Sequence, residues 1–168
     1  MTERKQAPRR AGLAPRLAIA SALVVGTATP VVTFYEGTVL YTYADPVGIP
    51  TACMGETGEH IRFGQRFTLD ECRAMLSESL YAHAQGLDRC ITAPLAPHEA
   101  AAILSWGYNV GVGAACRSTM VKMINAGAPP QRWCQQFDRW VYAKGFKLNG
   151  LVKRRAAERA LCEGRQPS

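Results

Sequence analysis

The stretch from Leu17 to Phe34 carries no charged side chain, and Glu36 follows it after a single residue. A helix needs about 20 residues to cross a hydrocarbon core of roughly 30 Å, so this stretch is barely long enough to span a bilayer. Its small and polar residues, Gly26 and Pro30 among them, work against insertion. We therefore expect a membrane segment that is only marginally stable in lipid.

The charges on either side of this stretch predict how the chain is divided. Residues 1–16 carry five Lys or Arg side chains against a single Glu, which is the pattern of a basic cytoplasmic N-terminus. We therefore expect a cytoplasmic segment over 1–16, a membrane segment over 17–34 and a globular domain over 35–168. Composition leaves open whether the segment is a cleaved signal peptide, a permanent anchor or an export signal that later leaves the membrane. Small residues around Gly26 and Ala28 would permit cleavage.

Length and charge bound the fold and the partner. A chain of 168 residues with 48% apolar content can form one globular domain plus an appendage. Its formal net charge of +7 favours an anionic partner, which could be nucleic acid, a phospholipid surface or a cell-wall polymer. Charge alone does not choose among them.

All six cysteines lie beyond the apolar stretch, and none forms a C-x-x-C pair. Disulfides in an oxidising compartment are the better interpretation, because buried free thiols in a cytosolic protein would conflict with the export signal. The pairing stays open. The three histidines lack metal-ligand spacing, so we expect neither a metal nor another cofactor. The disulfide candidates are Cys53, Cys72, Cys90, Cys116, Cys134 and Cys162.

Two acids and a hydroxyl stand close together as Glu36-x8-Asp45-x5-Thr51. A glycosidic bond is cleaved when one carboxylic acid protonates the leaving oxygen and a second polar group steadies the sugar cation or activates water. Each residue also has a plainer interpretation. Glu36 could border a membrane, Asp45 precedes a proline as turn residues do, and Thr51 could be an ordinary strand residue. Glu56 and Glu59 are rival acids only if Glu36 fails.

The chain changes character near Thr68. Residues 35–67 are rich in Gly, Pro, Thr and aromatics, with strand candidates at 39–43 and 49–54. Thr68 and Glu71 form a capping box that opens a long helix. Four more helical segments are predicted, opened by Pro97, by Ser118, by an apolar stripe over 133–141, and after Gly150. The expected fold is therefore α+β, a small β-rich lobe and a larger helical lobe with a ligand cleft between them.

With these features the chain resembles the phage-type lysozymes of glycoside hydrolase family 24. The resemblance extends over roughly residues 34–163. It includes FYEG at 34–37, YNVGVG at 108–113, RWVYAKG at 139–145 and GLVKRRAAERALC at 150–162. One departure follows the catalytic threonine, where the family commonly reads T-I-G-x-G-H and this chain places Glu56 at the histidine position.

The resemblance implies a lysozyme-like fold and a monomeric enzyme that hydrolyses peptidoglycan without a cofactor and without binding nucleic acid. Glu36 would be the general acid, Asp45 an ionised carboxylate, and Thr51 a partner of the attacking water, in an inverting displacement. Arg154 and Arg155 could contact the carboxylate groups of the substrate. Alternatively, Arg154 only braces a solvated helix through Glu158, four residues later.

The N-terminal half resembles a subgroup, the signal-anchor-release endolysins. This implies an inactive form tethered in the host inner membrane by residues 17–34 and an active form released into the periplasm at full length, with a membrane-depolarising holin as companion. No cysteine precedes Cys53, so the tether itself, and not a disulfide exchange, would withhold the active fold. The rival functions are a lytic transglycosylase and a membrane-tethered glycan-binding protein.

Overall fold

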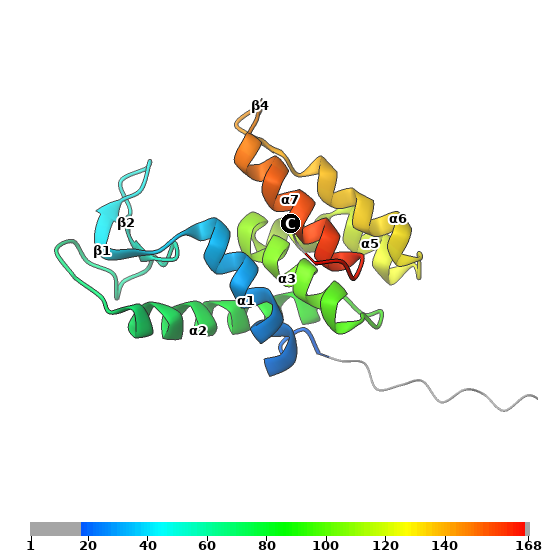
Figure 1. The fold of residues 1–168 in the computed structure, drawn as a ribbon, viewed down its shortest axis with the longest axis horizontal. Helices are drawn as coiled ribbons and strands as arrows, with labels where there is room; N and C mark the ends of the chain where they lie inside the picture. Colours follow the sequence, from blue (N-terminus) through cyan, green and yellow to red (C-terminus); the bar gives the residue numbers. More distant parts are fainter. Residues whose placement is uncertain (1–17, 167–168) are drawn as a thin grey trace, which may run out of the picture.

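Within residues 18–166, strands are confined to two short hairpins and helices make up most of the remainder (Figure 1). The computed structural model describes residues 18–166, and the predicted basic segment over 1–16 lies outside them. In chain order the elements are α1 (Ala22–Glu36), β1 (Val39–Ala44), β2 (Pro50–Cys53), α2 (Leu69–Asp88), α3 (Pro97–Val110), α4 (Val112–Arg117), α5 (Thr119–Asn125), α6 (Pro130–Trp133), the 3-10 helix η1 (Cys134–Arg139), β3 (Tyr142–Ala143), β4 (Phe146–Lys147) and α7 (Asn149–Cys162).

The β lobe is built on the antiparallel pair β1 and β2, which lies apart from the helices in Figure 1. Tyr43 pairs with Thr51, so the hairpin turn falls between these strands. The loop that follows β2 returns along β1, where the Phe67 amide donates to the Leu40 carbonyl. Both predicted strands are thus confirmed within two residues of their ends.

Helix α2 begins at the predicted capping box and connects the two lobes (Figure 1). The Thr68 hydroxyl accepts from the Glu71 amide, and the Glu71 carboxylate accepts from the Thr68 amide. These bonds satisfy amides that the first helical turn otherwise leaves unpaired. Leu76, Leu80 and Leu87 then place a buried stripe along the helix.

Helix α3 is the centre of the helical lobe. Pro97 occupies its first turn as predicted, and the side chains from 99 to 107 are all buried. A helix that is apolar on every side needs neighbours on every side. α1, α2 and α7 supply them.

The apolar stretch predicted as a separate signal-anchor helix forms α1 of this lobe. Ser21 caps the helix, and Val24, Val25, Ala28 and Val32 are buried, because α3 offers them an apolar partner. Among the helices of residues 18–166, none has the length and apolar character that crossing a bilayer requires. The structure therefore shows residues 22–34 packed against the other helices of this lobe.

The six cysteines form three disulfides, which confirms the expectation drawn from their number and position. Cys53–Cys72 joins β2 to the first turn of α2, and so ties the β lobe to the long helix. Cys90–Cys116 joins the end of α2 to α4, and Cys134–Cys162 joins η1 to the end of α7. Each bond closes a loop and removes freedom from the unfolded chain.

The prediction of a single helix over 133–141, followed by an end at Gly145, is wrong. The segment divides into α6, η1 and the β3–β4 hairpin. Trp133 and Phe137 are buried as expected. Lys144 and Gly145 both have positive φ, which a two-residue hairpin turn of type I′ requires. Gly145 therefore allows a hairpin turn and does not end a helix.

Asp88, the last residue of α2, holds the start of the docked segment. Its Oδ1 and Oδ2 accept from the Ile19 and Ala20 amides at 2.9 and 3.0 Å. A negative charge at a helix C-terminus is disfavoured by the helix dipole. The tertiary contact with the segment before α1 compensates for this unfavourable position.

Replacing Asp88 by Ala should lower the free energy of unfolding by about 2–3 kcal/mol, because two amides lose a charged acceptor. Denaturant titration with the disulfides intact measures this change. Asp70→Ala on the same helix is the matched control, since the Asp70 side chain is 92% exposed and forms a surface ion pair with Arg73. Equal transition midpoints for the two variants would contradict the role of Asp88.

Candidate active site

Glu36 is the last residue of α1, at the junction between the helical lobe and the β lobe. Gly37 follows with φ +71°, and its amide donates to the Thr33 carbonyl. Only glycine adopts this conformation without strain, so the chain can leave the helix abruptly and enter β1. The turn leaves the Glu36 side chain at the boundary between the lobes.

Arg154 of α7 fixes one oxygen of Glu36. Its Nη1 donates to Glu36 Oε1 at 2.6 Å, and the Arg154 side chain is only 4% exposed, against 22% for Glu36. The Tyr35 ring lies 5.7 Å from the guanidinium carbon and adds a cation–π contact. Glu36 Oε2 lies 3.7 Å from the position that a Cβ on Gly55 would take. One oxygen is therefore held by the protein while the other faces Gly55.

A buried charge cluster supports this arginine. Glu158 has no exposed surface and accepts from Arg154 Nε at 3.1 Å, from Arg155 Nη1 at 2.5 Å and from the Ser105 hydroxyl at 2.8 Å. Burial raises the pKa of the Glu158 carboxyl, while Arg155 and Arg154 oppose that effect by favouring the charged form. The cluster fixes the Arg154 guanidinium in one position, where Nη2 also donates to the Ser105 carbonyl.

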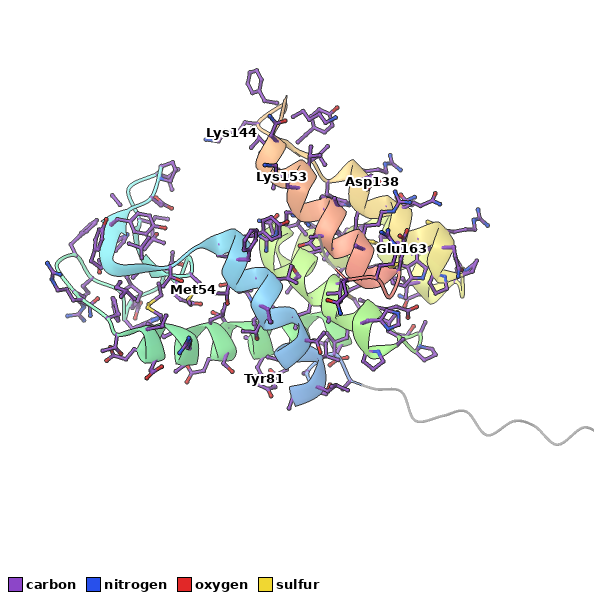
Figure 2. All side chains as sticks on the ribbon, in the orientation of Figure 1. Met54, Tyr81, Asp138, Lys144, Lys153 and Glu163 are labelled. Atoms are coloured by element: carbon purple, nitrogen blue, oxygen red, sulfur yellow. A yellow bond between two sulfur atoms is a disulfide. The ribbon has the colours of Figure 1, made fainter. Side chains whose placement is uncertain are left out.

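Glu36 opens onto a polar pocket of about 300 Å³ between the lobes. Met54, labelled in Figure 2, belongs to the β-lobe side of its wall. The lining residues are Glu36, Met54, Gly55, Glu56, Thr57, Ser79, His83, Tyr108 and Asn109. Hydroxyl, imidazole, amide and carboxyl groups therefore meet in one cavity, where they can orient a polar ligand.

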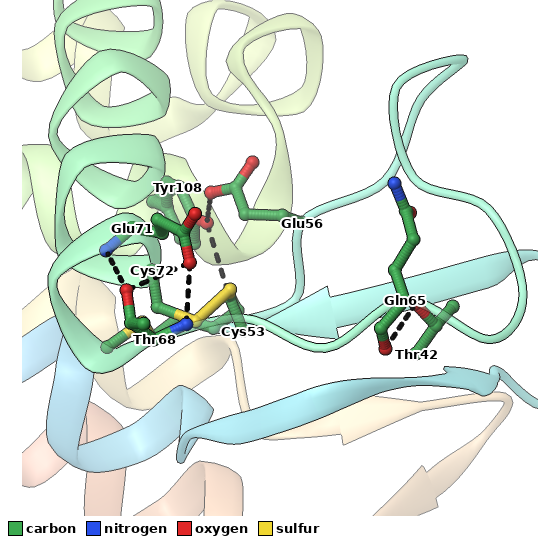
Figure 3. Close-up of a disulfide and its surroundings, with 9 residues drawn as sticks. Thr42, Cys53, Glu56, Gln65, Thr68, Glu71, Cys72 and Tyr108 are labelled. Carbon is green, nitrogen blue, oxygen red and sulfur yellow. Dashed lines mark hydrogen bonds between the residues drawn. A yellow bond between two sulfur atoms is a disulfide. The ribbon is translucent and has the colours of Figure 1, made fainter.

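A second carboxyl, Glu56, lies in the wall of this pocket and is only 7% exposed. Its Oε2 accepts from the Ser79 hydroxyl of α2 at 2.8 Å. Its Oε1 accepts from the Tyr108 hydroxyl of α3 at 3.3 Å (Figure 3). The pKa of Tyr108 is raised mainly by its burial, and further by the nearby charges of Glu56 and Glu36. Tyr108 therefore remains a neutral donor at physiological pH.

Asp45 and Thr51 both lie on the β1–β2 hairpin that starts just after Glu36, but neither lines this pocket. Asp45 is half-buried at the turn, where its Oδ1 accepts from the Val47 and Ile49 amides at 2.9 and 2.8 Å. Thr51 is 4% exposed, and its hydroxyl donates to the Ile49 carbonyl at 3.1 Å. Their catalytic roles therefore stay predictions.

Arg154 and Arg155 are 3% and 1% exposed, and both bind carboxylates of the protein itself. Little guanidinium surface is therefore exposed for a direct contact with substrate carboxylates, and this contact stays a prediction. The expected pairing of Arg154 with Glu158 is present, but the helix face that carries it is buried and not solvated. The i, i+4 spacing predicts the pair and says nothing of its burial.

Sequence reasoning missed the grouping of Glu56, Ser79 and Tyr108. Tyr108 stands in the YNVGVG segment, and Glu56 was noted only as a rival acid. Their contacts join positions 52 and 23 residues apart, which no local periodicity connects. The departure from the family pattern at Glu56 was the one signal available.

Comparison with known proteins places these features in a family. The model of the family described as phage lysozyme matches residues 33–158. A SAR-endolysin of Enterobacteria phage P21 is 36% identical to this chain over 146 residues, which cover 87% of each protein. A SAR-endolysin of Escherichia phage Mu is 37% identical over 119 residues, which cover 71% of this chain and 68% of the phage Mu protein. The structure of an endolysin from Escherichia coli O157:H7 phage FAHEc1 superimposes with a TM-score of 0.74 at 26% identity, covering 89% of this chain and 96% of that one.

Glu158→Gln should destabilise the protein by about 3–5 kcal/mol, because two buried guanidiniums lose their shared counter-charge. The free energy of unfolding from denaturant titration measures this loss. Glu163→Gln is the control, at the residue that follows the last turn of α7 (labelled in Figure 2). Glu163 pairs with Arg159 and Arg165 near the surface, where an ion pair contributes about 0–1 kcal/mol. A similar loss in both variants would contradict the importance of the buried cluster.

Proposed function

Because the chain belongs to the phage lysozyme family, we propose that it is an endolysin, an enzyme that hydrolyses bacterial peptidoglycan and so lyses the host cell. The proposed target is the β-1,4 bond between N-acetylmuramic acid and N-acetylglucosamine. The observation that carries the proposal is the setting of Glu36, whose carboxyl is held by buried Arg154 on one side and opens onto the polar pocket on the other.

Glu36 is the proposed general acid. Oε1 accepts from Arg154, so a proton on this carboxyl belongs on Oε2, the oxygen on the side of Gly55 and the pocket. A glycosidic oxygen bound there can take that proton as its bond to the anomeric carbon breaks. Arg154 thereby determines which oxygen donates.

Asp45 and Thr51 take the remaining proposed roles in a single, inverting displacement. Two backbone amides donate to Asp45 Oδ1 and fix the side chain at the turn, and its proposed role is to steady the sugar cation. The single proton of the Thr51 hydroxyl goes to the Ile49 carbonyl, so its oxygen is an acceptor for the attacking water. Protein groups and water suffice for this chemistry, and no cofactor takes part.

The localisation we propose follows from the two uses of residues 17–34. In the tethered form they span the host inner membrane, with residues 1–16 in the cytoplasm. In the released periplasmic form they dock as α1. Burial of Val24, Val25 and Val32 stabilises the docked form by about 1.5–3 kcal/mol for each side chain. Glu36 can reach Arg154 only when α1 is docked. Release after depolarisation by a holin would therefore assemble the site.

Glu36→Gln should abolish hydrolysis while leaving the fold intact, because the amide cannot donate the proton. Mass spectrometry of muropeptides released from purified peptidoglycan tests this. The wild type and the control Glu78→Gln, an exposed carboxylate on α2, should produce reducing N-acetylmuramic ends. Wild-type activity in Glu36→Gln would reject the assignment of the acid. Anhydro ends would indicate a lytic transglycosylase, and binding without release would indicate a glycan-binding protein.

Collapse of the membrane potential should move the full-length protein from the membrane fraction to the soluble periplasmic fraction, because the span is weak and α1 has a docking site. Fractionation followed by intact-mass measurement checks both position and length. A product shortened near residues 26–30 would favour a cleaved signal peptide instead.

A further inference from the structure

The pocket beside Glu36 is small for the proposed substrate. Its volume is about 300 Å³, near the lower end of the range for small-molecule sites. Peptidoglycan is a polymer, whose sugar rings and peptide carboxylates continue on both sides of the bond to be cut. An enzyme that cuts this polymer therefore meets most of it on the surface next to the pocket.

The β3–β4 hairpin adjoins the pocket through α7, the helix that directly follows it. Asn149 is the first residue of α7, and Arg154, the partner of Glu36, lies five residues later. At a rise of 1.5 Å per residue, the two are about 7.5 Å apart along the helix axis. The Tyr35 hydroxyl donates to the Lys153 carbonyl at 3.0 Å, so the same turn of α7 is fixed to α1 beside the proposed acid.

The hairpin exposes two aromatic rings. Tyr142 is 62% exposed and Phe146 is 72% exposed, although Val141 just before them is buried. Tyr142 pairs with Lys147, and Ala143 pairs with Phe146, so the two rings lie on opposite faces of the ribbon. Figure 1 shows the hairpin projecting beyond the N-terminal end of α7. Grouped apolar side chains on an exposed projection mark an interaction site.

The surface around these rings is positively charged. From residue 139 to residue 157 the chain has six Lys or Arg side chains and no carboxylate. Arg154 and Arg155 bind Glu158, whereas the ion pairs within residues 18–166 involve none of the lysines at 144, 147 and 153. Figure 2 labels Lys144 on the hairpin and Lys153 on α7. Such a surface attracts an anionic partner.

Lys144 occupies a position that the backbone does not favour for lysine. Its φ is +51°, and the type I′ turn prefers Asn, Asp or Gly there. The conformation of the turn therefore gives no reason for a positive charge at the tip of the hairpin. An anionic partner gives one.

We propose that the β3–β4 hairpin is a substrate-binding arm, which holds peptidoglycan beside the active-site pocket. Tyr142 and Phe146 pack on the apolar C–H faces of sugar rings, and Lys144 and Lys147 pair with carboxylates of the peptides. This inference rests on the proposed function and adds to it the surface that binds the polymer outside the pocket. An anionic membrane is the rival partner. It fits less well, because the rings lie on opposite faces and the tip is Lys144 and Gly145.

Two double variants remove the two kinds of contact and preserve the hairpin. Tyr142→Thr with Phe146→Thr places at both positions a residue that favours strands. Lys144→Asn with Lys147→Gln removes both charges and gives the turn a residue that suits positive φ. All four side chains are exposed, so both variants should melt at temperatures close to that of the wild type.

The experiment measures kcat and KM of the released full-length enzyme on purified peptidoglycan. Each double variant should raise KM about five- to tenfold and change kcat by less than about twofold, because the contacts lie outside the reacting atoms. Added salt should raise KM of the wild type and of the aromatic variant, and should change KM of the lysine variant much less, because salt screens exposed charges.

Phe63→Thr and Lys122→Gln are the matched controls. Both side chains are exposed, and neither belongs to the hairpin. Both controls should keep the wild-type KM. An unchanged KM in the hairpin variants, an equal rise in the controls, or a fall in kcat at constant KM would overturn the inference.

A binding measurement separates the two partners without turnover. In a Glu36→Gln background, sedimentation with insoluble peptidoglycan should retain less of each hairpin variant than of the controls. Vesicles of phosphatidylglycerol and phosphatidylethanolamine should bind all of these proteins equally. Loss of vesicle binding with unchanged retention on peptidoglycan would overturn the inference in favour of a membrane surface.

The wild type distinguishes failure of this inference from failure of the proposed function. If the wild type releases muropeptides and the hairpin variants keep its KM and its retention on peptidoglycan, the inference alone fails. If the wild type releases none, the proposed function fails, and the sedimentation measurement still shows whether the hairpin binds peptidoglycan.

Discussion

The buried guanidinium of Arg154 is the contact on which the arrangement of the helical lobe depends. It binds Glu36 at the end of α1, the Ser105 carbonyl on α3 and Glu158 within α7. A buried charge that loses one partner costs several kcal/mol, so the three helices must meet in one geometry for the cluster to be satisfied. The same geometry places the proposed acid at the junction of the lobes. Stability and function therefore share one set of contacts.

This dependence bears on the proposal that one segment serves two environments. The residues that α1 buries are small or medium apolar groups, which suit both a core and a weak membrane span. The hydroxyls of Thr27 and Thr29 donate to carbonyls four residues earlier, at 2.8 and 2.7 Å, so the helix satisfies them itself in either setting. Only the docked helix gives Glu36 its partner. In the proposed tethered form the enzyme would therefore lack its assembled site.

The pocket is a product of the interface between lobes. The β lobe contributes the turn that carries Glu56, and the helical lobe contributes Ser79, Tyr108 and the buried cluster behind Glu36. A disulfide and a network of hydroxyl bonds join the two sides. Glu36 opens onto this wall and is held by Arg154 from the other side, so its surroundings are a property of the whole interface and not of its own helix.

Local patterns in the sequence predicted much of the molecule, namely the capping box at Thr68, both strands of the β lobe, the helix opened by Pro97 and the presence of disulfides. Local patterns failed to predict the features that depend on contacts between residues far apart in the sequence. The cysteine pairing, the burial of the Arg154–Glu158 pair, the hairpin at Gly145 and the docking of the apolar stretch were not predicted. Glu36 and Arg154 stand 118 residues apart. Periodicity and capping act over a few residues, whereas this ion pair and the two-carboxyl pocket exist only once packing has brought remote segments together.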